Sequence, residues 1–196
     1  MNIVKDGYDK IAKVYLANRD RLKSGKYVQQ LLKYLPKKSI ILDLGCGAGI
    51  PVDDILIKAG HSVVGIDISL EQIKLARQSC RAGDFLVGDI RDLKLDEYRV
   101  QAIVSFYTIF HVPRDEQLKL LKILSSYLSA GGMLLVTMGD REFEGEHTMY
   151  GEPMWSSQYG TVKNRKLLES AGFSILLDEI DTSGGERHQV IIAFKK

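Results

Sequence analysis

The sequence predicts an α/β domain: a doubly wound, mostly parallel seven-stranded sheet with helices on both faces and a C-terminal antiparallel hairpin. Short apolar runs alternate with helical patterns along most of the chain, which is typical of a parallel sheet. The last two apolar runs are separated only by the polar residues 181–186, which favours a hairpin. A length of 196 residues suits one such domain, so we expect residues 1–196 to form a single domain.

The first predicted strand, Ser39 to Leu44, stops at a cluster of glycines. The helix that follows has Pro51 in its first turn, where proline is tolerated, and runs to Gly60. Ser69 can cap the helix after the second strand. The other strands of the parallel part are expected at 61–66, 84–87, 100–106 and 133–138, with a helix at 115–127 between the last two.

The pattern changes after the fifth strand. Residues 139–160 contain glycines and aromatic residues with no clear period, so we expect a loop or a short irregular segment there. A helix over 161–171 ends at Gly172, a natural C-terminal stop. The hairpin strands are expected at 173–180 and 187–194.

Residues 1–38 are predicted to form N-terminal helices. The first 40 residues contain ten Lys or Arg against Asp6, Asp9 and Asp20, a net charge of +7. One interpretation is a pair of solvated helices packed on the sheet edge. The other is a flap over the active site, whose lysines touch an anionic ligand or RNA.

Composition indicates a cytoplasmic protein that is an enzyme or a small binding module. The net charge is only +2, so the chain as a whole has too little positive charge to attract nucleic acid. Cys46 and Cys80 cannot form a disulfide framework and fit a reducing cytosol. No apolar run approaches the roughly 18 residues needed to cross a bilayer, and the N-terminus lacks the apolar core of a signal peptide. No metal site is predicted.

The segment from Ile41 to Gly49 combines a buried strand, an acidic residue within it and glycines at alternate positions. Between a strand and a helix, such glycines let a ligand approach the backbone closely. The third glycine falls at Gly49, which departs from the dinucleotide fingerprint. Asp43 would oppose a pyrophosphate at this loop but would suit a cationic headgroup.

Two more carboxylates follow the next two strands. Asp67 ends the second strand, where a carboxylate can accept both hydroxyls of a ribose. Asp89 follows the third strand and could accept a hydrogen bond from an adenine amino group. Singly, Asp43, Asp67 and Asp89 could be a turn former, a helix cap and a surface residue. Together they match the cationic amino-acid part, the ribose and the adenine of S-adenosylmethionine.

With these motifs the chain resembles the seven-stranded, Rossmann-like S-adenosylmethionine-dependent methyltransferases over essentially its whole length, the closing hairpin included. Small-molecule members often begin with a Tyr-Asp-x-x-Ala-x-x-Tyr element, matched here by Tyr8, Asp9, Ala12 and Tyr15. The resemblance implies a set of cofactor-binding residues: Tyr15, Asp43, Gly45, Cys46, Gly47, Gly49, Asp67, Ile68, Asp89, Ile90, Ser105 and Phe106.

His111 is the candidate catalytic residue, on the loop after the fourth strand. A neutral imidazole there could take a proton from a substrate hydroxyl or amine. The alternative is that His111 orients the loop by hydrogen bonding or touches the cofactor without proton transfer. His147 is a weaker candidate, and His61 and His188 are expected to be structural.

Residues 139–160 are predicted to cover the substrate as an insertion. They are rich in aromatic residues and carry five acidic residues against Arg141 alone, a net charge of −4. We expect Tyr8, Tyr107, Tyr150 and Trp155 to bind a small, mostly apolar or amine-bearing acceptor. The alternative is a solvated acidic loop.

The predicted function is therefore methyl transfer from S-adenosylmethionine to a small-molecule acceptor, by a monomer or homodimer with no membrane partner. Ser105-Phe106-Tyr107-Thr108 lacks the Asn/Asp-Pro-Pro-Tyr/Phe motif of enzymes that methylate amino groups of DNA bases or glutamine. The alternatives are an RNA or protein methyltransferase, to which the basic N-terminal helices point, and a non-enzymatic nucleotide-binding module. Nucleic acid is not the expected partner.

Overall fold

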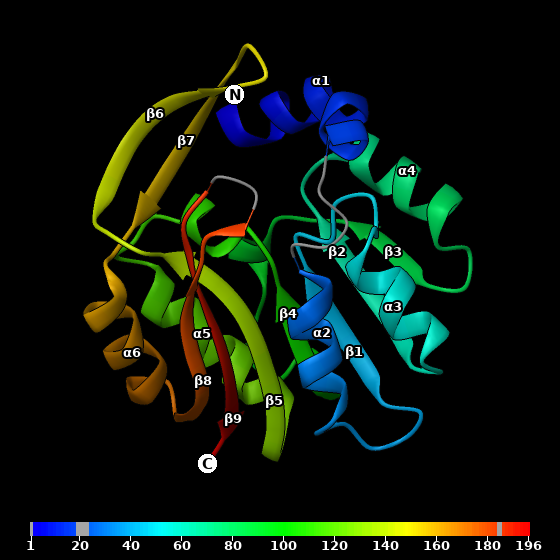
Figure 1. Cartoon of the computed structure of the whole chain (residues 1–196), viewed down its shortest axis with the longest axis vertical. Coiled ribbons are helices and arrows are strands. Elements are labelled where there is room, and N and C mark those ends of the chain that lie inside the picture. The colour runs from blue at the N-terminus through cyan, green and yellow to red at the C-terminus, as the bar shows by residue number, and fades with distance from the viewer. Residues whose placement is uncertain (1, 19–23, 184–185) are drawn as a thin grey trace.

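The computed structural model describes residues 2–18, 24–183 and 186–196 (Figure 1). Its main sheet has seven strands in the order β3-β2-β1-β4-β5-β9-β8. The strands are β1 (Ile40–Leu44), β2 (Ser62–Asp67), β3 (Asp84–Val87), β4 (Val100–Ser105), β5 (Leu128–Gly139), β8 (Phe173–Asp181) and β9 (His188–Lys195). Strands β1 to β5 pair in parallel, and β9 is antiparallel to both β5 and β8. The predicted fold class is confirmed.

Helices cover both faces of the sheet because successive strand residues point to opposite sides. Leu42 joins the core beneath α5 (Gln117–Tyr127) and α6 (Thr161–Ser170), whereas its neighbour Ile41 joins the core beneath α2 (Gly25–Leu32) and α3 (Val52–Lys58). The same alternation runs through β4, where Ile103 faces the first core and Ala102 the second. Helix α4 (Leu70–Ser79) packs through a third cluster beside β3.

The strand order reverses at β1, which lies between β2 and β4. In doubly wound sheets, the crevice outside the carboxyl ends of the strands at such a reversal is where ligands bind. The glycine loop after β1, Asp67 at the end of β2 and the loop after β4 all come to this edge.

The expectation of a loop over residues 139–160 is wrong for most of the segment. β6 (Phe143–Met149) and β7 (Glu152–Gln158) form a separate two-stranded antiparallel sheet. Tyr150 and Gly151 join them with φ values of 49° and 85°, as a tight hairpin turn requires. Nearly all of β6 is exposed, so its sequence shows no alternation of buried and exposed residues. In Figure 1 this hairpin stands beyond the main sheet, next to α1 (Ile3–Asn18).

The glycines at 131 and 132, which mark a turn before the fifth strand in the sequence, lie inside β5. The register of β5 with β4 shifts between Val100↔Leu128 and Ala102↔Met133, so the extra residues form an irregularity within the strand. Strand β5 is therefore longer than the 133–138 predicted from the apolar run.

Helix α1 lies across the carboxyl edge of the sheet, whereas α2 packs into the core on one face. Gly7 brings α1 close to β7, because a Cβ at this position would lie 2.7 Å from the Met154 side chain. Lys10 forms an ion pair with Glu152 of β7 at 2.8 Å. Helix α1 thus lies over the edge of the sheet, where the flap interpretation would place it, and its Lys5 and Lys10 pair with carboxylates of the chain itself.

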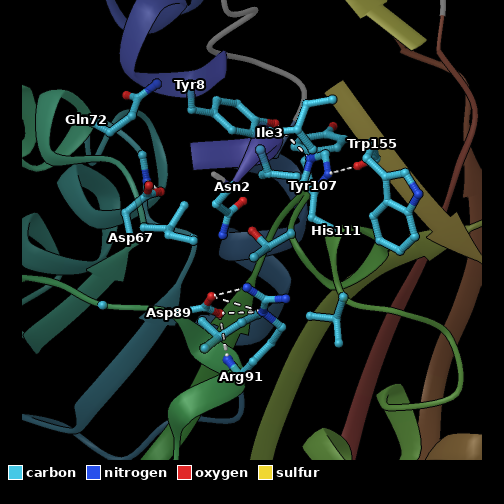
Figure 2. A pocket seen from close by; sticks show the side chains of 18 of the residues that line it. Asn2, Ile3, Tyr8, Asp67, Gln72, Asp89, Arg91, Tyr107, His111 and Trp155 are labelled. Carbon is cyan, nitrogen blue, oxygen red and sulfur yellow. Dashed lines mark hydrogen bonds and ion pairs between the residues drawn. The ribbon is translucent and has the colours of Figure 1, made fainter. Parts of the chain in front are cut away.

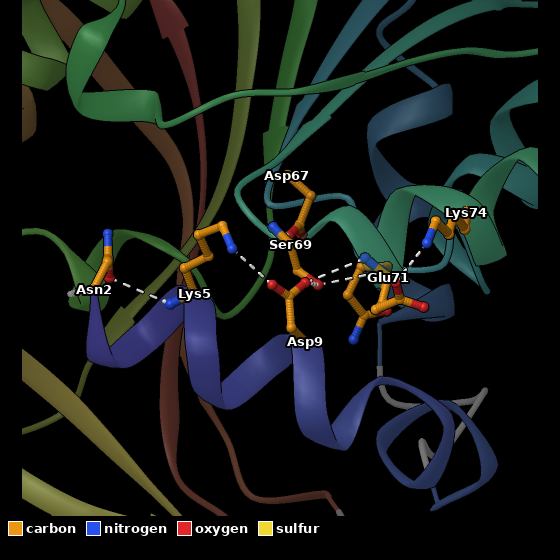
Figure 3. A network of polar contacts seen from close by, with 8 residues as sticks. Asn2, Lys5, Asp9, Asp67, Ser69, Glu71 and Lys74 are labelled. Carbon is orange, nitrogen blue, oxygen red and sulfur yellow. Dashed lines mark hydrogen bonds and ion pairs between the residues drawn. The ribbon is translucent and has the colours of Figure 1, made fainter.

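Asp9 attaches the other side of α1 to the start of α4 (Figure 3). One carboxylate oxygen accepts hydrogen bonds from the Ser69 hydroxyl at 2.7 Å and the Glu71 backbone N–H at 3.2 Å. The other oxygen accepts from Lys5 at 2.8 Å. Helix α1 is thus held at both sides above the edge of the sheet.

Among the described residues, no helix is both long enough and apolar enough to span a membrane.

Candidate active site

A cavity of about 330 Å³ lies beneath α1 at the carboxyl ends of β1, β2 and β4 (Figure 2). Eight of the twelve predicted cofactor-binding residues line it: Tyr15, Gly45, Gly47, Asp67, Ile68, Asp89, Ile90 and Phe106. They come from five separate segments of the chain, which the fold brings to one place. We refer to this space as the first cavity.

Asp67 ties the glycine loop to the start of α4. Its Oδ2 accepts a hydrogen bond from the Gly47 N–H at 2.9 Å, and its Oδ1 accepts one from the Ser69 N–H at 2.8 Å. Ser69 in turn caps α4 by accepting from the Gln72 N–H. The side chain of Asp67 is nearly buried and its carboxylate faces the first cavity.

The glycine loop needs glycine at Gly45 for two reasons. Its φ of +72° lies in the left-handed region, and a Cβ there would lie 1.8 Å from Oγ1 of Thr108. At Gly47, whose φ is +56°, a Cβ would meet only Gln72 Oε1, at 3.7 Å. The loop therefore presents bare backbone to the first cavity on one side and packs tightly against the β4 loop on the other.

Gln72 also lines the first cavity, although the sequence pattern gave no reason to select it. Its side chain is 1 % exposed, and neither Nε2 nor Oε1 has a hydrogen-bond partner within the described part of the chain. A buried amide without partners costs free energy, so it indicates a polar ligand at this wall. The bare glycine backbone, the Asp67 carboxylate and the Gln72 amide fit a ligand with hydroxyl and amino groups.

Asp89 is held by Arg91 at another wall of the first cavity. Its carboxylate forms an ion pair with the guanidinium at 2.5 Å and accepts the Arg91 backbone N–H at 2.9 Å. Burial alone would raise the pKa of Asp89, but the hydrogen bonds from Arg91 outweigh it and hold the pKa below its usual value. Asp89 is therefore a fixed carboxylate acceptor beside Ile90.

Four predicted cofactor-binding residues do not line the first cavity. Asp43 is buried within β1, and the Ser105 hydroxyl donates to the Leu44 carbonyl at 3.0 Å. Cys46 packs into the cluster beneath α4, where burial raises the pKa of its thiol. Gly49 faces Cys80 and Asp53. These four residues shape the loop from behind, and their direct contact with a cofactor stays a prediction.

A second cavity of about 710 Å³ lies between α1, the β6–β7 hairpin and the start of β9. It shares Tyr8, Tyr15, Tyr107 and His111 with the first cavity. Of the predicted acceptor-binding residues, Tyr8, Tyr107 and Tyr150 line this second cavity. Trp155 lines the first cavity instead.

Phe110, which the sequence did not single out, lines the second cavity together with Tyr107 and His188. Phe110 stacks on His188 with ring centroids 5.5 Å apart, and Tyr107 meets His188 edge-on at 4.8 Å. His188 was expected to be structural. Because β9 is antiparallel, its first residue pairs with Gly139 at the carboxyl end of β5, which places His188 at the cavity. His61, by contrast, accepts a hydrogen bond from the Ser39 backbone N–H, away from both cavities.

His111 bridges α1 and the hairpin. Its Nδ1 lies 2.7 Å from the Trp155 carbonyl oxygen, and its Nε2 lies 3.0 Å from the Tyr8 hydroxyl. Burial lowers the pKa of His111 to about 4, and the bond to the Trp155 carbonyl opposes this shift only in part. The imidazole is therefore neutral near pH 7.

This depressed pKa predicts a pH dependence of stability. Unfolded His111 titrates near pH 6.5, so between about pH 6.5 and 4 the unfolded chain binds a proton that the folded chain does not. The free energy of unfolding should therefore fall as the pH falls through this window. Between pH 7.0 and pH 4.5 we expect the free energy of unfolding to fall by about 2 kcal/mol more in the wild type than in His111→Gln. Denaturant unfolding at the two pH values measures both losses. Equal losses in both proteins would contradict the assignment.

Comparison with known proteins relates these features to methyltransferases. Residues 41–132 match the family model described as "Methyltransferase domain". The chain is 26% identical over 167 residues to carboxy-S-adenosyl-L-methionine synthase of Campylobacter curvus, covering 75% of this chain and 68% of that protein. It is 27% identical over 138 residues to ubiquinone biosynthesis O-methyltransferase of Actinobacillus pleuropneumoniae, covering 65% of this chain and 56% of that protein. The chain spans between 28% and 68% of the first three curated relatives it matches.

The fold is shared with magnesium protoporphyrin IX methyltransferase from Synechocystis PCC 6803, solved with bound SAH. The two structures have a TM-score of 0.78 at 18% identity, covering 98% of this chain and 97% of that chain. This likeness concerns the fold.

A sheet that reverses its order at β1, with a glycine loop and carboxylates at the reversal, defines a Rossmann-like cofactor-binding domain. The matching methyltransferase domain model covers the glycine loop and all three carboxylates, Asp43, Asp67 and Asp89. Residues 41–132 therefore match a methyltransferase domain, and the chain shares the Rossmann-like fold of S-adenosylmethionine-dependent methyltransferases, which supports S-adenosylmethionine as its cofactor.

Proposed function

We propose that the protein transfers a methyl group from S-adenosylmethionine to a small-molecule acceptor that carries a planar ring. The observation behind this proposal is that two cavities meet at Tyr8, Tyr15, Tyr107 and His111. The first cavity has the carboxylates and bare backbone that suit the cofactor, and the second is large enough for a separate small molecule. A methyl group presented at the shared wall would face the acceptor directly.

The walls of the first cavity would hold the cofactor through Asp67 at the ribose, Asp89 and Ile90 at the adenine, and the backbone of Gly45 and Gly47 at the methionine part. Gln72 would complete this set with its unpartnered amide. When bound, S-adenosylmethionine supplies a methyl group that its sulfonium already makes electrophilic. The chain's own task is then to align the acceptor and to exclude water.

The second cavity favours a ring-bearing acceptor over a charged one. Phe110, Tyr107 and His188 form one aromatic wall, and Tyr15 contacts Tyr150 edge-on across the cavity at 6.4 Å. Its charged residues are Asp140, Arg141, Glu186 and Arg187, of which Arg187 forms an ion pair with Asp140 at 2.9 Å and Glu186 lies 3.3 Å from His188. Rings recognise other rings by offset or edge-to-face contact. The relative from Actinobacillus pleuropneumoniae is named ubiquinone biosynthesis O-methyltransferase, which is consistent with such an acceptor.

The alternative of an RNA or protein substrate rests on the basic N-terminal helices. Within the described residues, Lys5 and Lys10 of α1 are already paired with Asp9 and Glu152, which weakens this alternative. RNA binding whose affinity falls steeply with salt would favour it nevertheless.

The test is an acceptor screen with methyl-labelled cofactor, scored by mass spectrometry of the products. We expect label in phenolic or heteroaromatic compounds and none in RNA or protein. Calorimetric titration should show tight binding of S-adenosylhomocysteine and none of NAD. Two curated relatives are named carboxy-S-adenosyl-L-methionine synthase, so the mass of the cofactor is also measured in the same experiment. A carboxylated cofactor and no methylated acceptor would overturn the proposal.

Phe110→Ala tests the second cavity, since Phe110 lines only that cavity. Losing a ring contact should raise the acceptor KM by about tenfold and leave the dissociation constant of S-adenosylhomocysteine within about twofold. Tyr34→Ala is a control, because Tyr34 is exposed and lies outside both cavities. A change in cofactor affinity without a change in acceptor KM would contradict the assignment of the second cavity.

A further inference from the structure

Tyr8 and His111 form a hydrogen-bonded pair in the wall shared by the two cavities (Figure 2). Tyr8 comes from α1, and His111 comes from the short 3-10 helix η2 (Ile109–His111) after β4. Their rings also meet edge-on, with centroids 5.5 Å apart. This shared wall is the place where a methyl donor in one cavity and an acceptor in the other would meet.

The direction of the Tyr8–His111 hydrogen bond follows from the second partner of the imidazole. The Trp155 carbonyl oxygen, 2.7 Å from Nδ1, can only accept a hydrogen bond. In the neutral ring Nδ1 must therefore carry the proton, and Nε2 is left as an acceptor. The Tyr8 hydroxyl, 3.0 Å away, then donates its proton to Nε2.

We propose that Tyr8 takes the proton of the methyl acceptor while it passes its own phenol proton to Nε2 of His111, an inference that rests on the proposed function. The acceptor's X–H bond breaks, and its proton moves to the Tyr8 oxygen. The electron pair left on X forms the bond to the methyl carbon, whose bond to sulfur breaks with the pair remaining on sulfur. His111 becomes an imidazolium that still donates from Nδ1 to the Trp155 carbonyl.

Tyr8 rather than His111 contacts the acceptor in this scheme, because both imidazole nitrogens are already engaged. Tyr8 is the catalytic residue, and His111 is a positioning residue that also receives the relayed proton. The titratable groups that face His111 are Tyr8 from α1 and His147 from β6, and β7 contributes the Trp155 carbonyl. Because burial lowers the pKa of His111, the imidazolium does not persist at neutral pH.

The first experiment needs no acceptor. Long-range ¹H–¹⁵N correlation spectra of the protein with bound S-adenosylhomocysteine report which imidazole nitrogen carries the proton. Between about pH 6 and 8 we expect His111 protonated at Nδ1 and bare at Nε2. In Tyr8→Phe the Nε2 resonance should move while the Nδ1 proton stays. Protonation at Nε2, or an Nε2 resonance that Tyr8→Phe does not move, would overturn the relay.

The second experiment compares two acceptors at about pH 8: catechol, which still carries its proton, and 4-nitrophenol, which has already lost it. Tyr8→Phe should lower kcat for catechol by about 100-fold, the usual size of a general-base contribution, and change 4-nitrophenol turnover by less than about threefold. His111→Gln can keep both hydrogen bonds but cannot hold a second proton, so it should show the same contrast. Tyr98→Phe, outside both cavities, supplies the baseline.

The double variant Tyr8→Phe/His111→Gln should lose no more than either single variant, because the two residues act in one relay. Equal losses on both phenols, or losses that multiply in the double variant, would overturn the relay. If the wild type turns over neither phenol, the proposed acceptor class fails, and the tautomer of His111 still decides for or against the Tyr8–His111 pair.

Discussion

Asp67→Asn should weaken binding of S-adenosylhomocysteine by about 100-fold. The Asp67 carboxylate accepts one backbone N–H from Gly47 and one from Ser69. An asparagine has one acceptor oxygen, so its amide N–H₂ would oppose one of these donors. Hydrogen bonds to a charged group contribute about 1.5–3 kcal/mol each, and the proposed bonds to the ribose hydroxyls would weaken as well. Calorimetric titration measures the loss.

Asp84→Asn is the matched control for this experiment. Asp84 begins β3 beside β2, is exposed and lies outside both cavities. We expect its affinity for S-adenosylhomocysteine to stay within about twofold of the wild type. If Asp67→Asn bound as tightly as Asp84→Asn, the proposed role of Asp67 at the ribose would be wrong.

Gly45→Ala should destabilise the protein by about 2–5 kcal/mol and abolish cofactor binding. The positive φ alone costs an alanine about 1–2 kcal/mol. The new methyl group would also lie 1.8 Å from Thr108 Oγ1, so the glycine loop or the loop after β4 must move, at a further cost of about 1–3 kcal/mol. Denaturant unfolding measures the loss of stability, and calorimetric titration measures the loss of cofactor binding.

Gly60→Ala separates the cost of the positive φ from the cost of the contact with Thr108. Gly60 has a φ of +88°, but a Cβ there would meet no atom within 4 Å, so only the backbone cost of about 1–2 kcal/mol applies. Thr108→Ala removes the two nearest atoms that Gly45→Ala would strike and should recover part of the lost stability in the double variant. Equal destabilisation at Gly45 and Gly60 would show that the contact with Thr108 does not matter.

The parts of the site that the sequence predicted well are those that lie at strand ends. Asp67 and Asp89 each follow an apolar run, and parallel strands bring their carboxyl ends to one edge, so both carboxylates were predicted from spacing alone. Side-chain direction within the loop was harder to predict. Cys46 and Gly49 belong to the predicted motif, but they turn towards α4 and Cys80, and only the folded loop determines this.

Features that depend on contacts between distant segments escaped the sequence. Gln72 reads as an ordinary helix residue, and only the packing of α4 beside the glycine loop buries its amide in a cavity wall. Strand β6 has no buried face to produce a period, and of the residues that β7 buries only Met154 is apolar, because the hairpin lies apart from the main sheet and contacts α1 and η2 through β7. The pairing of His111 with Tyr8 joins residues 103 positions apart.

Helix α1 and the β6–β7 hairpin, which both lie beyond the main sheet, belong to segments of opposite charge. The basic start of the chain and the acidic segment around the hairpin nearly cancel in the total of +2. In the structure the two segments meet, with Lys10 of α1 paired with Glu152 of β7. This exposed pair contributes at most about 1 kcal/mol, so the close packing of Gly7 on Met154 also matters for the position of α1.

The order of the main sheet has a consequence for how copies of the chain behave at high concentration. Its two outer strands are β3, which has only four residues, and β8, which carries Asp178, Glu179 and Asp181. An outer strand of this kind is a poor template for a strand of another molecule, because it is too short or because like charges would face each other across the new pair. We therefore expect self-association by sheet extension, and the aggregation that begins with it, to be disfavoured at both edges.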